Sequence, residues 1–543
     1  MQFRGKKAIS VLFAVLLVLA TVLAGCSSSK DSGTTSAGNV SSPSDETGAS
    51  GSGDQEEQPR YGGILKMAYN LEPNAIGWPA LISTYEDQNI SRPAIENLGR
   101  YNTSGELEPL LAERWETDPQ NNTVTFYLRQ GILFHDGTEF DAEAVKWNIE
   151  QFMASGRNEL KGITSIDVLD KYTVRLNMDS WNNSMINSVC VFVGMVSPTA
   201  AQQNGAEWAA VNPVGTGPFK FDGWERQVSI KYVKNENYWQ KGLPYLDGIE
   251  IKFIADTMSA AAAFKSGEVH AYMNLTPETA HELSLSGAEI ITASYGGRTF
   301  GIIGNSSDSI SPFADVRVRK ALGHAIDSKA IVDSLYYGYA KVTNQWGVPG
   351  GWSFNPSLVG QPYDPEKAKQ LLAEAGYPDG FKTTLVIDNS QEDRNVFTAV
   401  QAYLKAVGID AEIDVVDKAL YVSMTSGDGV WGDGLVSYHG KAEAELGTYM
   451  PRNLSEKGTL YVNGITHPQE VEDLFDELRA ALDDETKKEV AHRLQTTVYE
   501  KYALITNLFV TTWPGAKYPE LKDEGWQNGH SHFWTPEKAY LQK

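Results

Sequence analysis

The chain has 543 residues, of which 41% are hydrophobic and 21% charged, and its formal net charge is −23. Such an acidic surface disfavours nucleic acid as a partner, and the composition excludes a fibrous or wholly disordered protein. The chain is too long for one hydrophobic core, so we expect two or three lobes.

The first 25 residues have the order of a secretory signal. Basic residues precede an apolar run from Ala8 to Leu23, which is shorter than the roughly 20 residues of a membrane-spanning helix. The run ends in Leu23-Ala24-Gly25-Cys26, which looks like a bacterial lipobox. We predict a signal peptide over residues 1–25 and a diacylglycerol thioether on Cys26; an uncleaved anchor with an incidental cysteine is the alternative.

Residues 26–59 are predicted to be a lipidated cysteine followed by a disordered tether. From Ser27 to Pro59 the chain is dominated by Ser, Gly, Thr, Asp and Glu and has no aromatic residue. Such a segment cannot bury enough apolar surface to offset the entropy lost on ordering. We therefore expect the globular part to be tethered at the outer face of the cytoplasmic membrane. With Cys26 lipidated, Cys190 has no disulfide partner and is expected to be a small buried apolar residue.

The first half of the globular part is predicted to contain mostly strands. Ile64–Tyr69 and Thr123–Leu128 are rich in strand-forming residues, and Asp141 is placed to cap a helix. The glycine-rich segment 212–220 contains Pro218 and lacks a Gly-Lys-Ser/Thr ending, so it is not expected to bind phosphate. It is expected to form a tight entry into a strand.

The second half has an α/β pattern. Residues 384–388 form an apolar strand, 396–407 carry a helical stripe of apolar residues, and 409–415 alternate as a second strand. This order predicts a βαβ unit and therefore a partly parallel sheet. A further strand is expected at 435–438, followed by two amphipathic helices between 471 and 502.

A search for catalytic or metal-binding motifs gives weak signals only. His281-Glu282 lacks the second histidine of a helical zinc site, and His530-Ser531-His532 has no acidic or sulfur partner nearby in the sequence. The loop 428–434 lacks calcium ligands at the required positions. We therefore predict no catalytic residue, no metal and no cofactor, and favour a binding protein over an enzyme.

Several sequence blocks together resemble the family 5 extracellular solute-binding proteins, which include dipeptide-, oligopeptide- and nickel-binding components of ABC importers. The blocks follow the family's order along the chain. They are Tyr61-Gly62-Gly63-Ile64-Leu65, Leu110-Leu111-Ala112-Glu113-Arg114-Trp115, residues 128–137, Val214-Gly215-Thr216-Gly217-Pro218-Phe219, Asn235-Glu236-Asn237-Tyr238-Trp239, residues 312–322 and Tyr363-Asp364-Pro365-Glu366-Lys367-Ala368.

The resemblance implies a two-lobed, periplasmic-binding-protein-like α/β fold with an extra peripheral subdomain and a hinge of two chain crossings. Lobe closure would then capture a solute and present the protein, expected to be a monomer, to an ABC permease and its ATPase subunits. The implied segments are 60–97, 212–303 and 511–543 for lobe I, 98–211 for the peripheral subdomain, and 304–510 for lobe II.

Open α/β sheets bind ligands at the carboxyl ends of their strands, which predicts where the solute contacts lie. Tryptophans in glycine-rich loops are added as aromatic walls, with packing beneath a loop as the alternative for each. The predicted ligand contacts are Asn70, Glu72, Trp346, Asn389, Trp431, Tyr438 and His439.

One departure from the family concerns the ligand. Peptide-binding relatives usually have an aspartate for the peptide amine shortly after the strand that corresponds to 435–438. This chain reads Tyr438-His439-Gly440-Lys441 there, so an amine would need another partner, such as Glu443 or Asp433. A peptide is expected from the family, and an oligosaccharide or other non-peptide solute is the alternative. A secreted hydrolase and a receptor-docking sensor are the remaining alternatives.

Overall fold

The computed structural model describes residues 58–542, with gaps at 83, 294–295, 443–445 and 527–533. The predicted signal, Cys26 and nearly all of the tether lie outside the described residues. From Gln58 onward the chain forms one compact unit. Within the described part, every helix is too short or too polar to span a bilayer.

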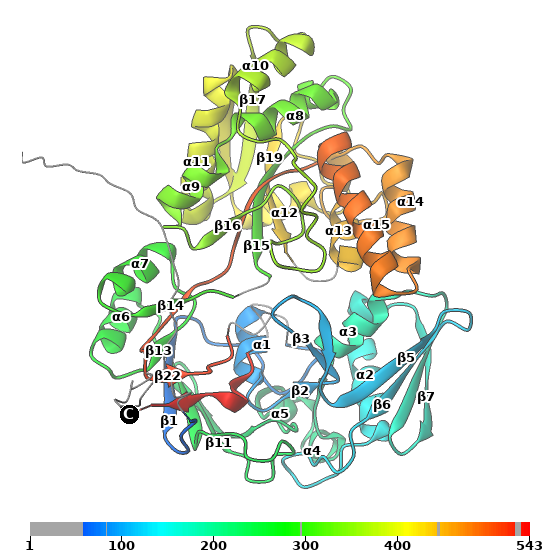
Figure 1. Cartoon of the computed structure of the whole chain (residues 1–543), viewed down its shortest axis with the longest axis vertical. Coiled ribbons are helices and arrows are strands. Elements are labelled where there is room, and N and C mark those ends of the chain that lie inside the picture. The colour runs from blue at the N-terminus through cyan, green and yellow to red at the C-terminus, as the bar shows by residue number, and fades with distance from the viewer. Residues whose placement is uncertain (1–57, 83, 294–295, 443–445, 527–533, 543) are drawn as a thin grey trace, which may run out of the picture. The chain divides into compact units, whose positions relative to one another are not determined.

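A seven-stranded sheet defines lobe I and gathers segments from both ends of the chain (Figure 1). β1 lies at its centre and pairs in parallel with β12 on one side and β13 on the other. β21, close to the C-terminus, is inserted between β13 and β14. In spatial order the strands are β10 (Phe219–Glu225), β11 (Ser229–Lys234), β12 (Gly248–Phe253), β1 (Ile64–Tyr69), β13 (Ala271–Tyr272), β21 (Gly515–Lys517) and β14 (Glu289–Ile291).

A second, four-stranded antiparallel sheet lies within residues 98–211, the segment predicted for the peripheral subdomain. Its strands, in spatial order, are β5 (Ala112–Asp118), β6 (Thr123–Leu128), β8 (Thr173–Met178) and β7 (Ile163–Asp170). Helix α2 (Ala142–Ala154) packs against this sheet, and Asp141 accepts a hydrogen bond from the Ala144 amide at its start, which confirms the predicted cap. Cys190 is a buried free thiol whose pKa is raised by burial.

A six-stranded mixed sheet defines lobe II. β17 and β18 pair in parallel, and α11 connects them along the chain, which confirms the predicted βαβ unit. In spatial order the strands are β16 (Ala340–Val342), β20 (Thr506–Thr511), β15 (Arg298–Gly304), β19 (Leu435–Lys441), β17 (Phe381–Asp388) and β18 (Ile409–Val416). The chain passes between the two large sheets twice, from β14 to β15 and from β20 to β21. The six-stranded sheet of lobe II thus begins at Arg298, which lies within the segment 212–303 predicted for lobe I. The other predicted domain boundaries stay predictions.

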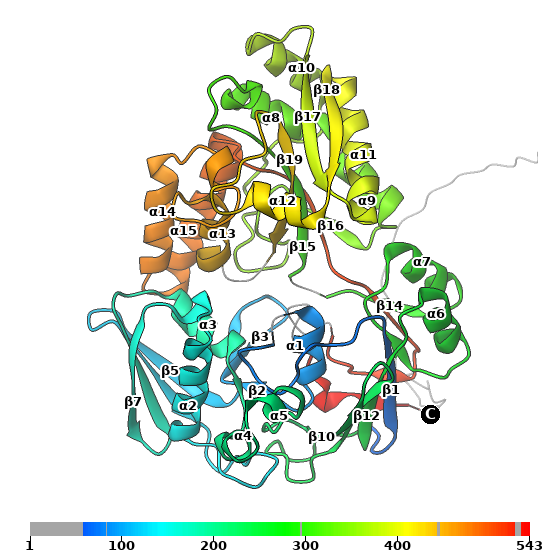
Figure 2. The same ribbon diagram turned by 180° about the vertical axis from the view of Figure 1, so that it is seen from behind.

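Helices cover both faces of the six-stranded sheet (Figures 1 and 2). Successive residues of β15 alternate between the two cores, with Ile302 in the cluster that includes α8 and α11 and Ile303 in the cluster that includes α14 and α15. The helices are α8 (Val316–Ala325), α9 (Ser328–Leu335), α10 (Pro365–Glu374), α11 (Gln391–Ala406), α12 (Lys418–Thr425), α13 (Leu446–Leu454), α14 (Gln469–Ala480) and α15 (Asp484–Thr496).

The remaining α-helices and β-strands lie in lobe I and the peripheral subdomain. They are α1 (Tyr85–Ser91), β2 (Glu96–Asn97), β3 (Gly99–Tyr101), β4 (Leu107–Pro109), α3 (Ser184–Phe192), β9 (Gly194–Met195), α4 (Pro198–Asn204), α5 (Ala206–Val211), α6 (Thr257–Lys265), α7 (Pro277–Leu285), β22 (Leu521–Lys522) and β23 (Tyr540–Leu541). Helices α6 and α7 pack together against the sheet of lobe I through a cluster that includes Phe264 and Tyr272.

Candidate functional site

A cavity of about 320 Å³ is lined by residues of both lobes and by the connection from β20 to β21. We call it the hinge-side cavity. Asn70, directly after β1, contributes from lobe I, and the first turns of α11, directly after β17, contribute from lobe II. This is the carboxyl edge of both sheets, where α/β folds bind ligands. The lining residues are Asn70, Leu71, Glu86, residues 274–278, Leu335, Tyr336, Glu392, Asn395, Val396, Thr511, Trp513 and Pro514.

The hinge-side cavity is acidic. Glu86, Glu278 and Glu392 line it, and its described lining residues include no lysine, arginine or histidine. Glu86 accepts a hydrogen bond from the Asn274 side-chain amide at 3.1 Å. Burial raises the pKa of Glu392, and the nearby carboxylates of Asp393 and Glu278 add to the rise, against Arg298 and the Tyr336 hydroxyl. The cavity therefore favours a cationic group over an anionic one.

The two residues predicted from β1 have different surroundings. The Asn70 amide nitrogen donates to the Asn274 carbonyl at 3.4 Å, and its side-chain oxygen is buried with no hydrogen-bond partner in the described part of the chain. Glu72 does not line the cavity. Its carboxylate accepts from the Trp224 indole at 2.7 Å and from the Gln227 amide at 3.0 Å, so it fastens the β10–β11 hairpin.

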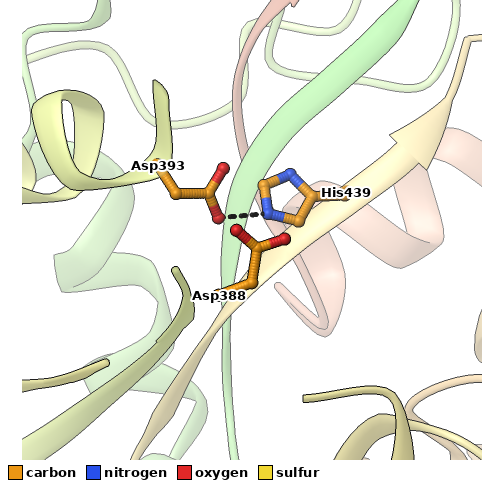
Figure 3. A group of neighbouring side chains, drawn as sticks. All are labelled: Asp388, Asp393 and His439. Atoms are coloured by element: carbon orange, nitrogen blue, oxygen red, sulfur yellow. Dashed lines mark hydrogen bonds and ion pairs between the residues drawn. The ribbon is translucent and has the colours of Figure 1, made fainter. Parts of the chain in front are cut away.

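A polar network adjoins the lobe II wall of the cavity through Arg298 and Glu392, and Figure 3 shows three of its members. Asp388 ends β17, Asp393 lies in the first turn of α11, and His439 lies on β19. The Nε2 atom of His439 is 2.7 Å from the Asp393 carboxylate. Arg298 reaches Asp393 at 3.3 Å, and Lys418 reaches Asp388 at 2.8 Å. Arg298 also pairs with Glu392 at 3.0 Å, which links the network to the cavity wall.

The protonation of this network follows from its burial. Burial lowers the pKa of His439, and Arg298 adds to the effect against the opposing pull of Asp393, so the imidazole is neutral at pH 7 and its Nε2–H donates to Asp393. The ligand atoms of Asp388, Asp393 and His439 lie within 4.8 Å of one another, a spacing that could hold a metal ion. Lys418 and Arg298 already supply cations to the two carboxylates, so the geometry is that of an ion-paired network that fixes the start of α11.

Three of the predicted aromatic contacts lie in the core of lobe II. Trp346, Trp431 and Tyr438 are 1%, 2% and 0% exposed and belong to one apolar cluster. The Trp431 indole donates to the Gly434 carbonyl, and its ring packs so closely on Gly464 that a Cβ there would be 2.1 Å away. Packing, the alternative considered for each, accounts for their positions, because a buried ring stabilises most when it is surrounded by other apolar side chains.

The other predicted contacts lie outside the hinge-side cavity. Asn389 is exposed in the turn between β17 and α11, and Asp433 is exposed, with its carbonyl accepting from the Ser311 hydroxyl. Glu443 lies outside the described residues. Of the seven predicted side chains, Asn70 lines the cavity and His439 lies in the polar network that adjoins it.

Sequence reasoning missed the cavity's carboxylates. Glu86 and Glu392 lie in the first turns of α1 and α11, whose N-caps are Thr84 and Ser390. The signal was present as a capping residue followed by acidic residues, which are favoured at a helix start. It did not identify these carboxylates as cavity residues, because acidic first turns are common in helices that have no ligand.

Comparison with known proteins agrees with this architecture. The family model "Bacterial extracellular solute-binding proteins, family 5 Middle" matches residues 106–434. The glutathione-binding protein GsiB of Shigella flexneri is 32% identical over 368 residues, which cover 66% of this chain and 71% of the relative.

Solved structures have the same fold. The periplasmic binding protein DppA from Helicobacter pylori, in complex with the peptide STSA, is 25% identical with a TM-score of 0.69, covering 89% of this chain and 99% of that one. HbpA2 from Haemophilus parasuis is 22% identical with a TM-score of 0.78, covering 89% and 100%. The predicted α/β fold of a periplasmic binding protein is thus confirmed.

The family model covers more than half of the chain, and the relative extends the match to two thirds of it. Family members are the non-enzymatic, solute-binding components of ABC importers, which sets the hydrolase alternative aside. The chain belongs to the bacterial extracellular solute-binding proteins, family 5.

Proposed function

We propose that this protein captures a peptide or peptide-like solute in the hinge-side cavity and delivers it to an ABC permease. The observation that carries the proposal is the set of three carboxylates, Glu86, Glu278 and Glu392, in a cavity between the lobes. A relative that binds glutathione and a structural neighbour that holds a peptide support the same solute class.

The charge of the cavity fits the amino terminus of a peptide. An ammonium group that enters a closed cavity loses its hydration, at a cost of several kcal/mol unless a carboxylate replaces the water. The stretch Tyr438–Lys441, within β19, has no carboxylate. Glu86 and Glu392 line opposite lobes of the hinge-side cavity, with Arg298 as the other partner of Glu392. The amine therefore has carboxylate partners at a different position.

Capture proceeds by closure of the lobes about the two connections between their sheets. A solute that contacts both walls of the cavity binds the closed state better than the open one, and this difference in affinity is what shifts the population towards closure. Lipidation of Cys26 and the tether of residues 26–59 hold the protein at the outer face of the membrane, beside the permease. Mass spectrometry of the mature N-terminus tests for the lipid.

The proposal predicts that the free amine of the solute determines its affinity. In titration calorimetry with the purified full chain, we expect the peptide Ser-Thr-Ser-Ala to bind at least about ten-fold more tightly than its N-acetylated form. Losing a charge-assisted hydrogen bond costs about 1.5–3 kcal/mol. Replacing Glu86 by glutamine should remove most of this preference.

The control is Glu207→Gln, the same change at an exposed position on α5. Equal binding of the free and acetylated peptides by the wild type would contradict the assignment of the cavity to the amine. Binding of a neutral oligosaccharide such as maltotriose, with no binding of peptides or glutathione, would favour the non-peptide alternative.

A further inference from the structure

Helix α14 of lobe II ends without the glycine that commonly terminates a helix. The chain reads Arg479-Ala480-Ala481-Leu482 at this point, and Ala481 has φ −55° and ψ 135°. The last carbonyls of a helix have no intrahelical donor, and a glycine in the left-handed conformation often brings amide donors back to them. Here the donors must come from elsewhere.

The donors come from the peripheral subdomain, from the segment just before α3. The Asn183 backbone amide donates to the Arg479 carbonyl at 3.0 Å. The Asn183 side-chain amide donates to the Leu478 carbonyl at 2.8 Å and to the Ala481 carbonyl at 3.1 Å. The Trp181 indole donates to the Ala481 carbonyl at 3.4 Å. Asn183, Leu478 and Ala481 are all buried. One lobe thus provides the C-terminal cap of a helix in the other.

The side chain of Asn183 is committed to this contact rather than to its own helix. Asn183 occupies the N-cap position of α3, where an asparagine usually accepts a hydrogen bond from its own first turn. In the described structure its side chain makes no such bond, and the Asn182 side chain accepts from the Ser184 amide instead.

Further groups reinforce the contact. Nearby, the Trp352 amide of lobe II donates to the Ser104 carbonyl at 3.2 Å, and an apolar cluster joins Tyr101 and Val191 to Val348 and Val510. A cavity of about 650 Å³ borders the contact and is lined from both sides, by Trp181 and Trp352 among others. Breaking the contact therefore separates this small cluster but leaves the large apolar clusters of the peripheral subdomain and of lobe II intact.

We infer that Asn183 and Trp181 form a latch through which the peripheral subdomain holds the lobes closed. The latch lies away from the hinge-side cavity, none of whose lining residues belongs to it. It sets solute affinity without touching the solute, because the apparent dissociation constant is the intrinsic one divided by the fraction of molecules already closed. The inference rests on the proposed function only for its effect on affinity.

The variant Asn183→Asp tests the latch. It replaces two donors by a carboxylate that faces the carbonyls, and thus the negative end, of α14. The amides of Asn183 and Trp352 both donate across the contact, so hydrogen exchange of the purified full chain reports on it directly. We expect the Trp352 amide, distant in sequence from the substitution, to exchange at least about ten-fold faster in the variant. This factor corresponds to the free energy lost with two hydrogen bonds.

With Ser-Thr-Ser-Ala as the solute, the dissociation constant should rise by about ten- to thirty-fold, mostly through faster dissociation. Asn204→Asp makes the same chemical change on α4. Among the described residues, the Asn204 side chain donates to the Ala200 carbonyl of its own helix. This control should leave the exchange rate of the Trp352 amide and the dissociation constant at their wild-type values. Asn183→Ser, which removes the two donors without adding charge, should give a smaller change in the same direction.

The exchange measurement needs no solute, so the latch and the proposed function can fail separately. Wild-type exchange at Trp352 in both Asn183 variants would overturn the latch whatever the protein binds. Faster exchange with no peptide binding by any form would uphold the latch and reject the proposed solute.

Discussion

Two sites of buried carboxylates, one in each lobe, have different hydrogen-bond and ion-pair partners. In lobe II, Asp393 contacts Arg298 and Asp388 contacts Lys418, at 3.3 and 2.8 Å. In lobe I, Glu96 on β2 accepts from neutral donors: the Tyr238 hydroxyl at 2.7 Å, the Thr216 hydroxyl at 2.8 Å and the Trp239 indole at 3.0 Å. The lysine beside Asp388 favours the charged form of that carboxylate, whereas the neutral donors around Glu96 only partly offset the effect of burial.

The pKa values of Glu96 and Asp388 shift in opposite directions. Burial raises the pKa of Glu96 to about 7, with Glu537 adding to the rise against the three hydrogen bonds. Burial alone would also raise the pKa of Asp388, but hydrogen bonds from Lys418 and Ser390 hold it well below its usual value. Lowering the pH therefore strengthens the contribution of Glu96 to stability and weakens that of Asp388.

The largest expected effect comes from breaking the paired network of lobe II. Replacing Asp393 by alanine leaves Arg298 and His439 without their shared acceptor in a site where the aspartate side chain is 0% exposed. Removing one partner of a buried pair costs about 3–5 kcal/mol. Urea unfolding monitored by tryptophan fluorescence measures the change in the free energy of unfolding.

Asp393→Asn is the matched control, since it keeps the shape and one acceptor for His439, and it should lose clearly less stability than the alanine variant. Equal, small losses in both variants, below about 1 kcal/mol, would show that the charges of lobe II are not coupled as the geometry implies.

The next effect concerns Glu96 and its dependence on pH. In the unfolded chain this group ionises near its ordinary pKa of 4.5, and in the folded chain near 7, so the folded state holds more protons between these values. The free energy of unfolding should therefore fall as the pH rises from about 5 to 7, by roughly 2–3 kcal/mol from this group alone.

Glu96→Gln should remove that part of the slope, as measured by denaturant unfolding at several pH values. Glu207→Gln, at an exposed site, should keep the wild-type slope. A Glu96→Gln profile that still parallels the wild type across this range would mean that Glu96 is ionised in the folded protein at pH 5.

The smallest effect is expected at Lys418, whose side chain is 63% exposed although its partner Asp388 is 5% exposed. Lys418→Ala should cost about 0.5–1 kcal/mol at pH 7, because water screens the exposed cation. It should also raise the pKa of Asp388, so that less stability is lost on acidification below about pH 4. Acid titration of the unfolding free energy, with exposed Lys329→Ala as control, measures both changes.

Much of the local structure was predictable from the sequence. The β17–α11–β18 unit follows from apolar residues spaced at two and at about 3.6 positions, and Asp141 was recognisable as a helix cap. These signals are strong because a strand or helix that buries one face imposes its own period on the chain. Asn70, at the carboxyl end of β1, lines the hinge-side cavity, and its contact with a solute stays a prediction.

The tertiary structure decided which side chains are buried and how the short strands pair. Trp346, Trp431 and Tyr438 follow glycine-rich loops or strand ends, as ligand walls would, but they lie in the core, because burial depends on which helices cover the loop. The short strand β21 has three residues and no usable pattern, and its place between β13 and β14 follows from pairing alone.

The sequence by itself determined the period-driven elements, their caps, the α/β class and, through its ordered blocks, the family. The tertiary structure alone brought Glu86 and Glu392 to opposite walls of one cavity, paired Asp393 with Arg298, and placed Asn183 at the end of α14. The physical reason is distance along the chain: periodicity and capping act over a few residues. The cavity, this ion pair and the lobe contact instead join segments at least 95 residues apart, whose meeting depends on the whole fold.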